Sequence, residues 1–161
     1  KENPNLDLRI GSGNKVPFNE KFDIVLASLV VHYIKDWNKM FSQIKRVLKK
    51  NGIFIFSTGN PIFETTERIK IKGKKVCILG DYFRERKYYT NWKPHNKKLT
   101  VKMPSYHLTY ETIIKTIIRN RFEIIDYKDA FPIKKAKKFF PEDYKFCSKV
   151  PFFTVWKVKK K

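Results

Sequence analysis

Two short apolar runs with a helical pattern between them constrain the fold of this chain more than any other feature. The run FDIVLASL over residues 22–29 is almost continuously apolar, which is typical of a strand buried on both faces of a parallel sheet. The run IFIFS over residues 53–57 indicates a second such strand. A strand, a helix and a parallel strand form a right-handed βαβ unit, so the sequence predicts an α/β domain.

The segment between the two runs has the pattern of an amphipathic helix. Asp36 is a good N-cap residue, and Asn51-Gly52 stops the helix because both residues tolerate a positive φ. Apolar residues recur at helical spacing between them, namely Trp37, Met40, Phe41, Ile44, Val47 and Leu48. One face of this helix is therefore expected to cover the sheet.

The rest of the chain continues the alternation of strands and helices. Leu6 to Ile10 reads as a short strand with alternating apolar positions. An irregular stretch follows the βαβ unit, with a hairpin expected around Gly73. Thr109 is expected to cap a second helix, and strands are expected over 122–127 and 151–158. Without repeats or a long linker, the 161 residues form a single domain.

Composition limits the partners and the compartment. The formal net charge is +21, which fits either a basic face that binds RNA, DNA or an anionic membrane, with weak, non-specific nucleic-acid binding as the expected form, or a lysine-rich composition without a polyanion partner. Cys77 and Cys147 are far apart and lie in no metal-ligand motif, so no metal site is expected and the cytoplasm is the expected location. No apolar run approaches the roughly 20 residues of a membrane helix, so no membrane partner is expected.

A family resemblance covers nearly the whole chain. The segment FDIVLASLVVHYIKDWNKMFSQIKRVLKKNGIFIFSTGNPIF, residues 22–63, resembles the second half of small-molecule class I S-adenosylmethionine-dependent methyltransferases. PSYHLTYETIIKTIIRNRFEIID, residues 104–126, and the ending VPFFTVWKVKK resemble the family's last strands. The resemblance implies a Rossmann-like α/β fold, truncated at the N-terminus, with a mixed sheet in the order 4-5-7-6 plus a short N-terminal strand. It makes residues 1–161 a single partial methyltransferase domain, in which residues 60–107 form an insertion or lid over the acceptor pocket.

The segment LDLRIGSGN, residues 6–14, looks at first like the family's glycine-rich cofactor loop. That loop opens a helix, whereas Pro17 and Phe18 follow here and the next strand begins at Phe22, which leaves no room for one. The segment better matches the loop after the family's third strand, where an acidic residue usually holds the adenine amino group and this chain has Ser12. The resemblance then gives the residues that contact S-adenosylmethionine as Gly11, Ser12, Gly13, Ser28 and Leu29.

Side chains just past the strands are the candidates for chemistry, because open α/β sheets bind ligands at the carboxyl ends of their strands. The candidates for catalysis are His32 and His107, and the alternative for each is a structural histidine. The candidates for acceptor binding are Tyr33, Asn60, Pro61 and Tyr106.

The predicted function is methyl transfer from S-adenosylmethionine to a small molecule, as the C-terminal part of the full enzyme. The fragment alone is expected to be inactive. The alternatives are a polyanion-binding or RNA methyltransferase part on the same scaffold, or an inactive fragment. The strand at 22–29 would lie at a bare edge if the family's earlier strands are missing, so it is expected to be covered by the N-terminal residues, a second copy or a separate N-terminal half.

Overall fold

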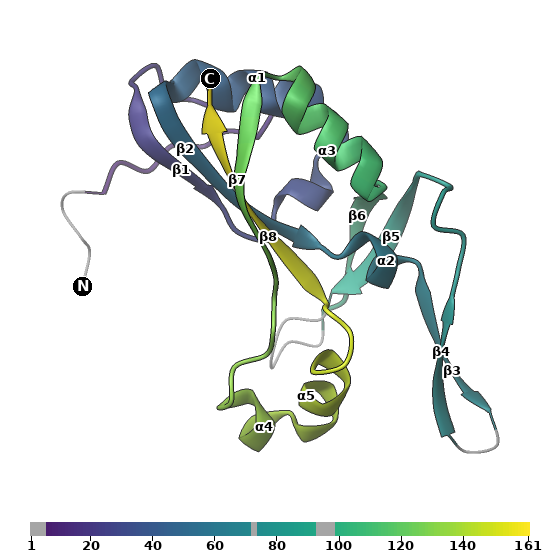
Figure 1. The fold of residues 1–161 in the computed structure, drawn as a ribbon. Helices are drawn as coiled ribbons and strands as arrows, with labels where there is room; N and C mark the ends of the chain where they lie inside the picture. The colour runs from purple at the N-terminus through teal and green to yellow at the C-terminus, as the bar shows by residue number, and fades with distance from the viewer. Residues whose placement is uncertain (1–5, 72–73, 93–98) are drawn as a thin grey trace.

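The computed structural model describes residues 6–71, 74–92 and 99–161, and a four-stranded mixed sheet forms its centre (Figure 1). The strands lie in the order β1 (Phe22–Ala27), β2 (Leu48–Gly59), β8 (Phe153–Lys160) and β7 (Phe122–Asp129). β1 is parallel to β2, and β8 is antiparallel to both of its neighbours. The predicted strand order 4-5-7-6 and the mixed α/β class are confirmed.

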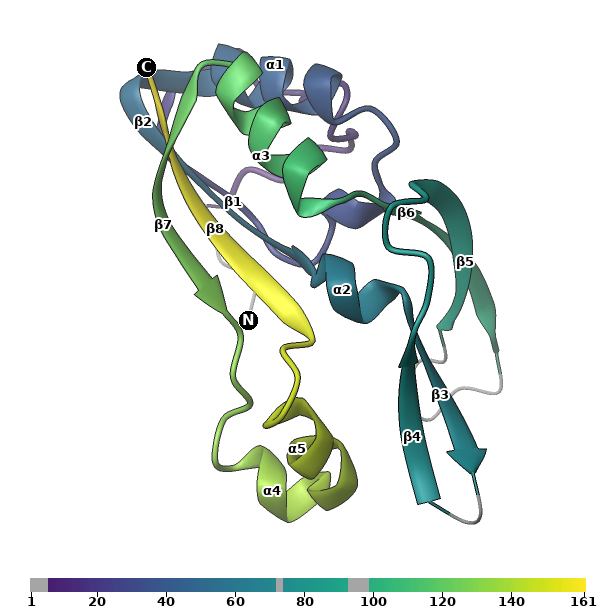
Figure 2. The same ribbon diagram turned by 45° about the vertical axis from the view of Figure 1, so that its right-hand side comes forward.

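Two helices cover one face of this sheet, α1 (Trp37–Val47) and α3 (Tyr110–Arg119), and they lie side by side in Figures 1 and 2. Both begin at the predicted N-cap. The Asp36 carboxylate accepts a hydrogen bond from the Lys39 backbone N–H at 2.9 Å, and the Thr109 hydroxyl accepts one from the Thr112 backbone N–H at 3.2 Å. These bonds satisfy amide donors that a helix start would otherwise leave unpaired.

The core lies between these helices and the sheet. Phe41 of α1 is fully buried at its centre. Its ring packs against Trp37, Phe54, Phe56 and Phe122, with ring centroids 6.2, 5.6, 5.9 and 5.4 Å away. Ile113 and Ile117 of α3 close the same core from the other helix. The apolar positions predicted from helical spacing therefore form the interface between helices and sheet.

β2 is longer than the sequence predicted. The strand pairing passes from Phe22–Leu48 directly to Ile24–Ile53, so the polar residues 49–51 form a bulge inside the strand. Asn51 has a φ of 63°, as expected for a turn residue. The helix ends at Val47, and the strand begins immediately after it.

Shorter elements surround the carboxyl end of β2. They are the 3₁₀ helix η1 (Val31–Tyr33), helix α2 (Pro61–Glu64), and the hairpins of β3 (Thr66–Ile71) with β4 (Lys74–Leu79) and β5 (Arg86–Trp92) with β6 (Val101–His107). Helices α4 (Ala136–Phe139) and α5 (Pro141–Cys147) connect β7 to β8. β3 and β4 form the predicted hairpin, although Gly73 itself lies outside the described residues.

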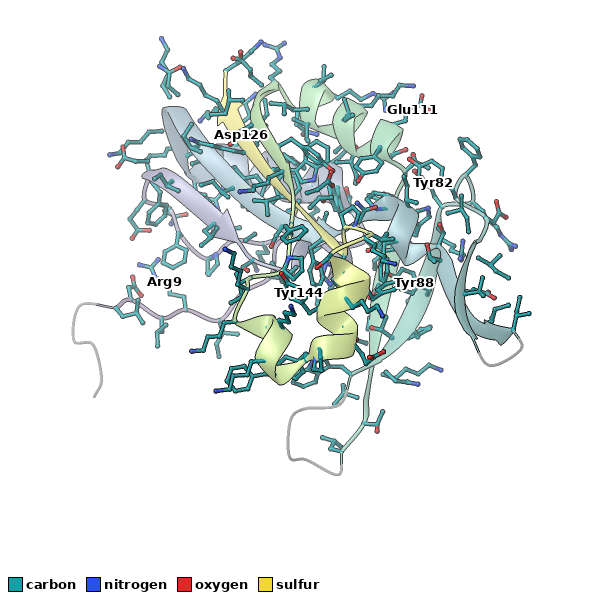
Figure 3. All side chains as sticks on the ribbon, turned by 60° about the horizontal axis from the view of Figure 1, so that its bottom comes forward. Arg9, Tyr82, Tyr88, Glu111, Asp126 and Tyr144 are labelled. Carbon is teal, nitrogen blue, oxygen red and sulfur yellow. The ribbon has the colours of Figure 1, made fainter. Side chains whose placement is uncertain are left out.

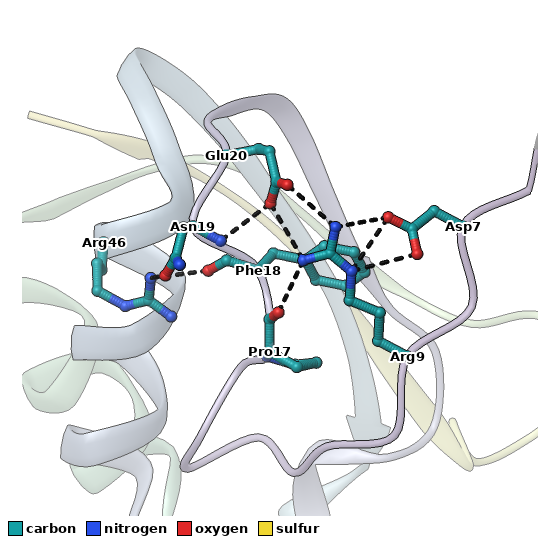
Figure 4. A network of polar contacts seen from close by, with 7 residues as sticks. All are labelled: Asp7, Arg9, Pro17, Phe18, Asn19, Glu20 and Arg46. Atoms are coloured by element: carbon teal, nitrogen blue, oxygen red, sulfur yellow. Dashed lines mark hydrogen bonds and ion pairs between the residues drawn. The ribbon is translucent and has the colours of Figure 1, made fainter.

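The predicted N-terminal strand at Leu6 to Ile10 is wrong. These residues are exposed coil, because the described part of the chain places no strand beside them. Side-chain contacts of Arg9 fix the segment instead (Figure 4). The guanidinium pairs with Asp7 at 2.7 Å and Glu20 at 3.0 Å, and it lies 4.5 Å from the centre of the Phe18 ring. The hydrogen bonds that Arg9 donates to both carboxylates raise its pKa above the ordinary value.

The strand β1 lies at the edge of the sheet, with β2 as its sole strand partner among the described residues. Ile24 and Leu26 are 60% and 69% exposed. The expectation that the N-terminal residues of this chain cover the strand is therefore wrong. A second copy or another polypeptide as the cover stays a prediction.

Candidate active site

The site begins where β2 ends. The Asn60 side chain caps α2 by accepting hydrogen bonds from the backbone N–H groups of Ile62 and Phe63, at 3.0 and 3.3 Å. Pro61 stands in the first turn, where its missing N–H costs nothing. Helical side chains point back toward the helix start, so the Glu64 carboxylate returns to the strand end. A Cβ on Gly59 would fall 2.1 Å from Glu64 Oε1, so glycine is the residue that fits there.

His107 lies against this carboxylate. Its Nδ1 is 3.5 Å from Glu64 Oε2, and its Nε2 is 2.8 Å from the Tyr82 carbonyl oxygen. Because a carbonyl oxygen can only accept, Nε2 carries a proton. The His107 side chain is 1% exposed and that of Glu64 is 10% exposed. Burial lowers the pKa of His107, but the contact with Glu64 and the hydrogen bond to the Tyr82 carbonyl outweigh it and leave that pKa above 6.5.

The pKa of His32 is shifted in the opposite direction from that of His107. Burial lowers the pKa of His32 below 6.5, and the charge of Glu64 opposes that effect without reversing it. His32 Nδ1 is buried and has no hydrogen-bond partner among the described residues. The Tyr33 ring lies 4.1 Å from the imidazole, centroid to centroid. The lowered pKa favours an uncharged imidazole at neutral pH, within reach of the charge of Glu64.

Tyr88 of β5 completes the surroundings of Glu64. Burial raises the pKa of the Tyr88 phenol, and the charge of Glu64 and a hydrogen bond to it raise that pKa further. The phenol therefore stays protonated and can donate to the carboxylate. Side chains from η1, β5 and β6 thus converge on one carboxylate at the carboxyl end of β2.

The two histidines are expected to titrate on opposite sides of their ordinary value of 6.5. His107 then stabilises the fold fully below pH 6.5, and this contribution is lost as the pH rises through its raised folded pKa. His32 acts in the opposite sense, and its contribution is lost as the pH falls through its lowered folded pKa. Titration of the histidine ring signals by NMR measures both values, with His32→Gln and His107→Gln variants for assignment. A His107 value below that of His32 would contradict the paired arrangement.

A loop before β5 holds His107 in place and attaches to the start of α3. Tyr82, labelled in Figure 3, accepts a hydrogen bond at its hydroxyl from the Tyr110 backbone N–H at 2.9 Å. Glu85 Oε1 accepts bonds from the Thr109 backbone N–H and hydroxyl, both at 2.9 Å. Burial raises the pKa of Glu85, but hydrogen bonds from Thr112 and Thr109 outweigh it and bring that pKa below its ordinary value. The Tyr82 carbonyl is thereby fixed for His107.

The structure uses the predicted acceptor residues in different ways. Tyr33 lies beside His32, within the site. Asn60 and Pro61 build the first turn of α2, and Asn60 Nδ2 lies 3.5 Å from Asp129 Oδ1. Tyr106 lies on the opposite face of the β5–β6 hairpin from His107, because adjacent strand residues alternate in direction.

Sequence reasoning missed Glu64 and Tyr88. A signal for Glu64 was present, since Asn60 followed by Pro61 predicts a helical turn whose fourth residue points back at the strand end. Tyr88 carried no local signal. It reaches the site through the pairing of β5 with β6, which places it opposite Ser105 and two residues from His107 on the same face.

The predicted cofactor residues form two neighbouring loops at the exit of β1. A Cβ on Gly13 would fall 2.2 Å from the Ile34 side chain, which directly follows η1. Leu29 has a φ of 50°, rare for leucine, and its backbone N–H donates to the Ser57 hydroxyl at 2.9 Å. Asn14 Oδ1 is buried without a hydrogen-bond partner among the described residues. These loops offer glycines, a hydroxyl at position 12 and an unpaired acceptor, which fits an amino-bearing ligand but supplies no carboxylate for it.

The residues that the structure describes include neither a metal-binding cluster nor a membrane-spanning helix. Within that part of the chain, no group of three or more His, Cys, Asp or Glu side chains is placed to hold a metal ion. In the same part, no helix is long and apolar enough to cross a membrane.

Comparison with known proteins bears on this arrangement. Residues 1–56 match the family described as "Methyltransferase domain". An S-adenosylmethionine-dependent methyltransferase from Listeria monocytogenes superimposes on all of this chain and 72% of its own length, with a TM-score of 0.81 and 22% identity. The chain has the class I methyltransferase fold. A second enzyme described in these terms, from Mesorhizobium loti, covers 93% of this chain and 67% of its own length, with a TM-score of 0.73 and 22% identity.

A curated relative adds sequence similarity. An uncharacterized protein of Haemophilus influenzae is 34% identical over 111 residues, which are 64% of this chain. The match spans 41% of the length of that relative. The resemblance of the sequence to class I S-adenosylmethionine-dependent methyltransferases is confirmed, and the site around Glu64 lies at the sheet end where this class of fold binds ligands.

Proposed function

We propose that the protein transfers a methyl group from S-adenosylmethionine to a small-molecule acceptor, and that His32 takes up the acceptor's proton. One observation carries the proposal. A histidine whose pKa is lowered by burial, and whose Nδ1 has no hydrogen-bond partner among the described residues, lies within reach of the charge of the buried Glu64 carboxylate at the carboxyl end of the sheet.

Methyl transfer from S-adenosylmethionine requires few catalytic groups from the protein. S-adenosylmethionine, when bound, supplies a methyl group on a positively charged sulfur. The protein must align the acceptor with that methyl, exclude water, and accept a proton if the acceptor carries one. The bound cofactor would supply the methyl group, and His32 would take up the proton that the acceptor gives up. Glu64 then stabilises the imidazolium, and His107 and Tyr88 hold Glu64 in position.

The enclosure of the site favours a small acceptor. Glu64 and His107 are almost fully buried, so a base within a folded nucleic acid would need to reach deep between α2 and the β5–β6 hairpin. Residues 60–107, which include both hairpins, are proposed as a lid over the acceptor. Gly11, Ser12, Gly13, Ser28 and Leu29 would hold the cofactor.

Transfer of a radioactive methyl group tests the proposal. The protein is incubated with methyl-labelled S-adenosylmethionine and a cell extract separated into small molecules, RNA and protein. With an active methyltransferase that contains this chain, label is expected in the small-molecule fraction and is expected to be absent with His32→Ala; the 161-residue chain alone is expected to transfer none. Label in RNA would overturn the proposed acceptor class, and label that survives His32→Ala would overturn the proposed base.

The 161-residue chain by itself should bind S-adenosylmethionine weakly, with a dissociation constant well above the micromolar range. The 161 residues are expected to hold neither the family's glycine-rich loop nor its ribose-binding carboxylate. In addition, Ser12 offers a hydroxyl where a charged carboxylate would pair about twice as strongly with an amino group. Isothermal calorimetry measures the affinity, and Ser12→Asp is expected to tighten it. Micromolar binding by the unmodified chain would mean that residues 11–13 form the main cofactor loop after all.

A further inference from the structure

The connection between β7 and β8 forms a protrusion that the proposed chemistry does not use. It consists of residues 131–149, includes α4 and α5, and is called the basic knob below. Figure 2 shows it at the lower end of the molecule, away from α1 and α3, and Figure 3 brings it to the front with Tyr144 labelled.

The basic knob exposes large apolar side chains that a protein in water normally covers. Phe131, Ile133, Phe139 and Phe140 are 65%, 71%, 59% and 60% exposed. The backbone fixes them there, because Phe140 N–H donates to the Ala136 carbonyl and Tyr144 N–H donates to the Phe140 carbonyl, both at 2.8 Å. Clustered exposed apolar side chains of this size mark an interaction surface.

Positive charge is interleaved with these apolar groups. Lys134, Lys135, Lys137 and Lys138 are all exposed on and before α4. The whole knob holds six lysines against two carboxylates, those of Glu142 and Asp143 at the start of α5. A surface of this composition complements an occupant that is both anionic and apolar.

We propose that the basic knob binds the surface of an anionic lipid bilayer. Lysines attract the negative headgroups while phenylalanine and isoleucine side chains enter the boundary with the acyl chains. Nucleic acid fits less well, because Ile133 cannot stack on bases and the knob contains no arginine. A second copy of the chain fits less well too, since two surfaces of like charge repel. The sequence predicted no membrane partner, and the proposal replaces that expectation with peripheral binding.

Co-sedimentation with lipid vesicles tests the proposal on the full chain. Binding is expected to vesicles of phosphatidylcholine with phosphatidylglycerol and to be near zero with phosphatidylcholine alone. Lys134→Gln/Lys135→Gln should lower the partition coefficient about 30-fold, from the attraction of two lysines to an anionic surface. Lys35→Gln/Lys39→Gln removes the same charge next to the start of α1 and should change binding less than twofold, about the spread of a remote surface change.

A second variant tests whether the exposed phenylalanine side chains contribute to vesicle binding. Phe139→Ser/Phe140→Ser keeps every charge and should lower vesicle binding about tenfold or more, because two ring insertions are lost. Equal losses from both lysine pairs, or unchanged binding of the Phe139→Ser/Phe140→Ser variant, would overturn the proposal in favour of non-specific charge attraction. Stronger binding to single-stranded RNA than to anionic vesicles, abolished by the same phenylalanine changes, would overturn it in favour of a nucleic-acid surface.

Discussion

If the proposed methyl transfer is correct, replacing His32 by Ala in the enzyme that contains this chain should lower kcat about 10²–10⁴-fold, the usual effect of removing a positioned acid or base. The Kd for S-adenosylmethionine should stay nearly unchanged, because the proposal gives His32 a contact with the acceptor and not with the cofactor. Steady-state kinetics and equilibrium cofactor binding separate the two effects. Unchanged turnover would reduce His32 to a structural residue.

The pH profile distinguishes a base from a packing residue. His32 must be neutral to accept a proton, and its pKa lies below 6.5. Activity should therefore fall on the acidic side of pH 6.5, and it should be constant just above it. Glu64→Gln removes the charge that raises the pKa of His32, so the acidic limb should move to lower pH while kcat falls. Glu67→Gln, the same change at an exposed position on β3, is the matched control and should leave the profile in place.

His107 should act through Glu64 rather than on the acceptor. Its Nε2 is bonded to the Tyr82 carbonyl, and its Nδ1 faces Glu64 Oε2 at 3.5 Å, as an ion-pair contact without a hydrogen bond. His107→Ala should therefore lower kcat and also shift the acidic limb, because Glu64 loses the group that holds it. A drop in kcat with an unmoved pH profile would instead place His107 in direct contact with the acceptor.

The arrangement of the sheet was predictable because local and long-range signals agree. A helix connects the two apolar strands at 22–29 and 53–57, and such a connection between parallel strands is almost always right-handed. The N-cap residues Asp36 and Thr109 fix where the two helices begin. The predicted end of the strand at residues 22–29 also placed His32 just past the carboxyl end of that strand. Consistency between propensity, pattern and topology is what makes such elements readable from sequence.

Other features depend on partners that a linear pattern does not reveal. Leu6 to Ile10 alternates like a strand, but a strand forms only where another strand pairs with it, and Arg9 binds Glu20 instead. Glu64 and Tyr88 meet His107 through a helical turn and a hairpin whose register no local signal sets. Residues 49–51 form a bulge in β2, but their sequence predicts a turn, because the same polar residues are common in bulges and in turns.

Phe41→Ala should destabilise the fold by about 3–5 kcal/mol, the range for a large aromatic side chain removed from a packed core. Phe41 is fully buried and packs edge-on against Phe54, Phe56 and Phe122, so its loss leaves a cavity that α1 and β2 cannot close without moving. Urea unfolding followed by circular dichroism measures the change in the free energy of unfolding.

The chain offers a matched control for this variant. Phe83 is 86% exposed, so Phe83→Ala removes the same atoms from water rather than from the core and should change stability by less than about 0.5 kcal/mol. Because domains of this kind are stable by only about 5–15 kcal/mol, Phe41→Ala can leave too little folded protein to titrate. Phe41→Leu keeps most of the volume and should cost about 1–2 kcal/mol, which stays measurable. Equal stabilities of the Phe41→Leu and Phe83→Ala variants would show that Phe41 is not the centre of the core, and that α1 does not pack on the sheet through it.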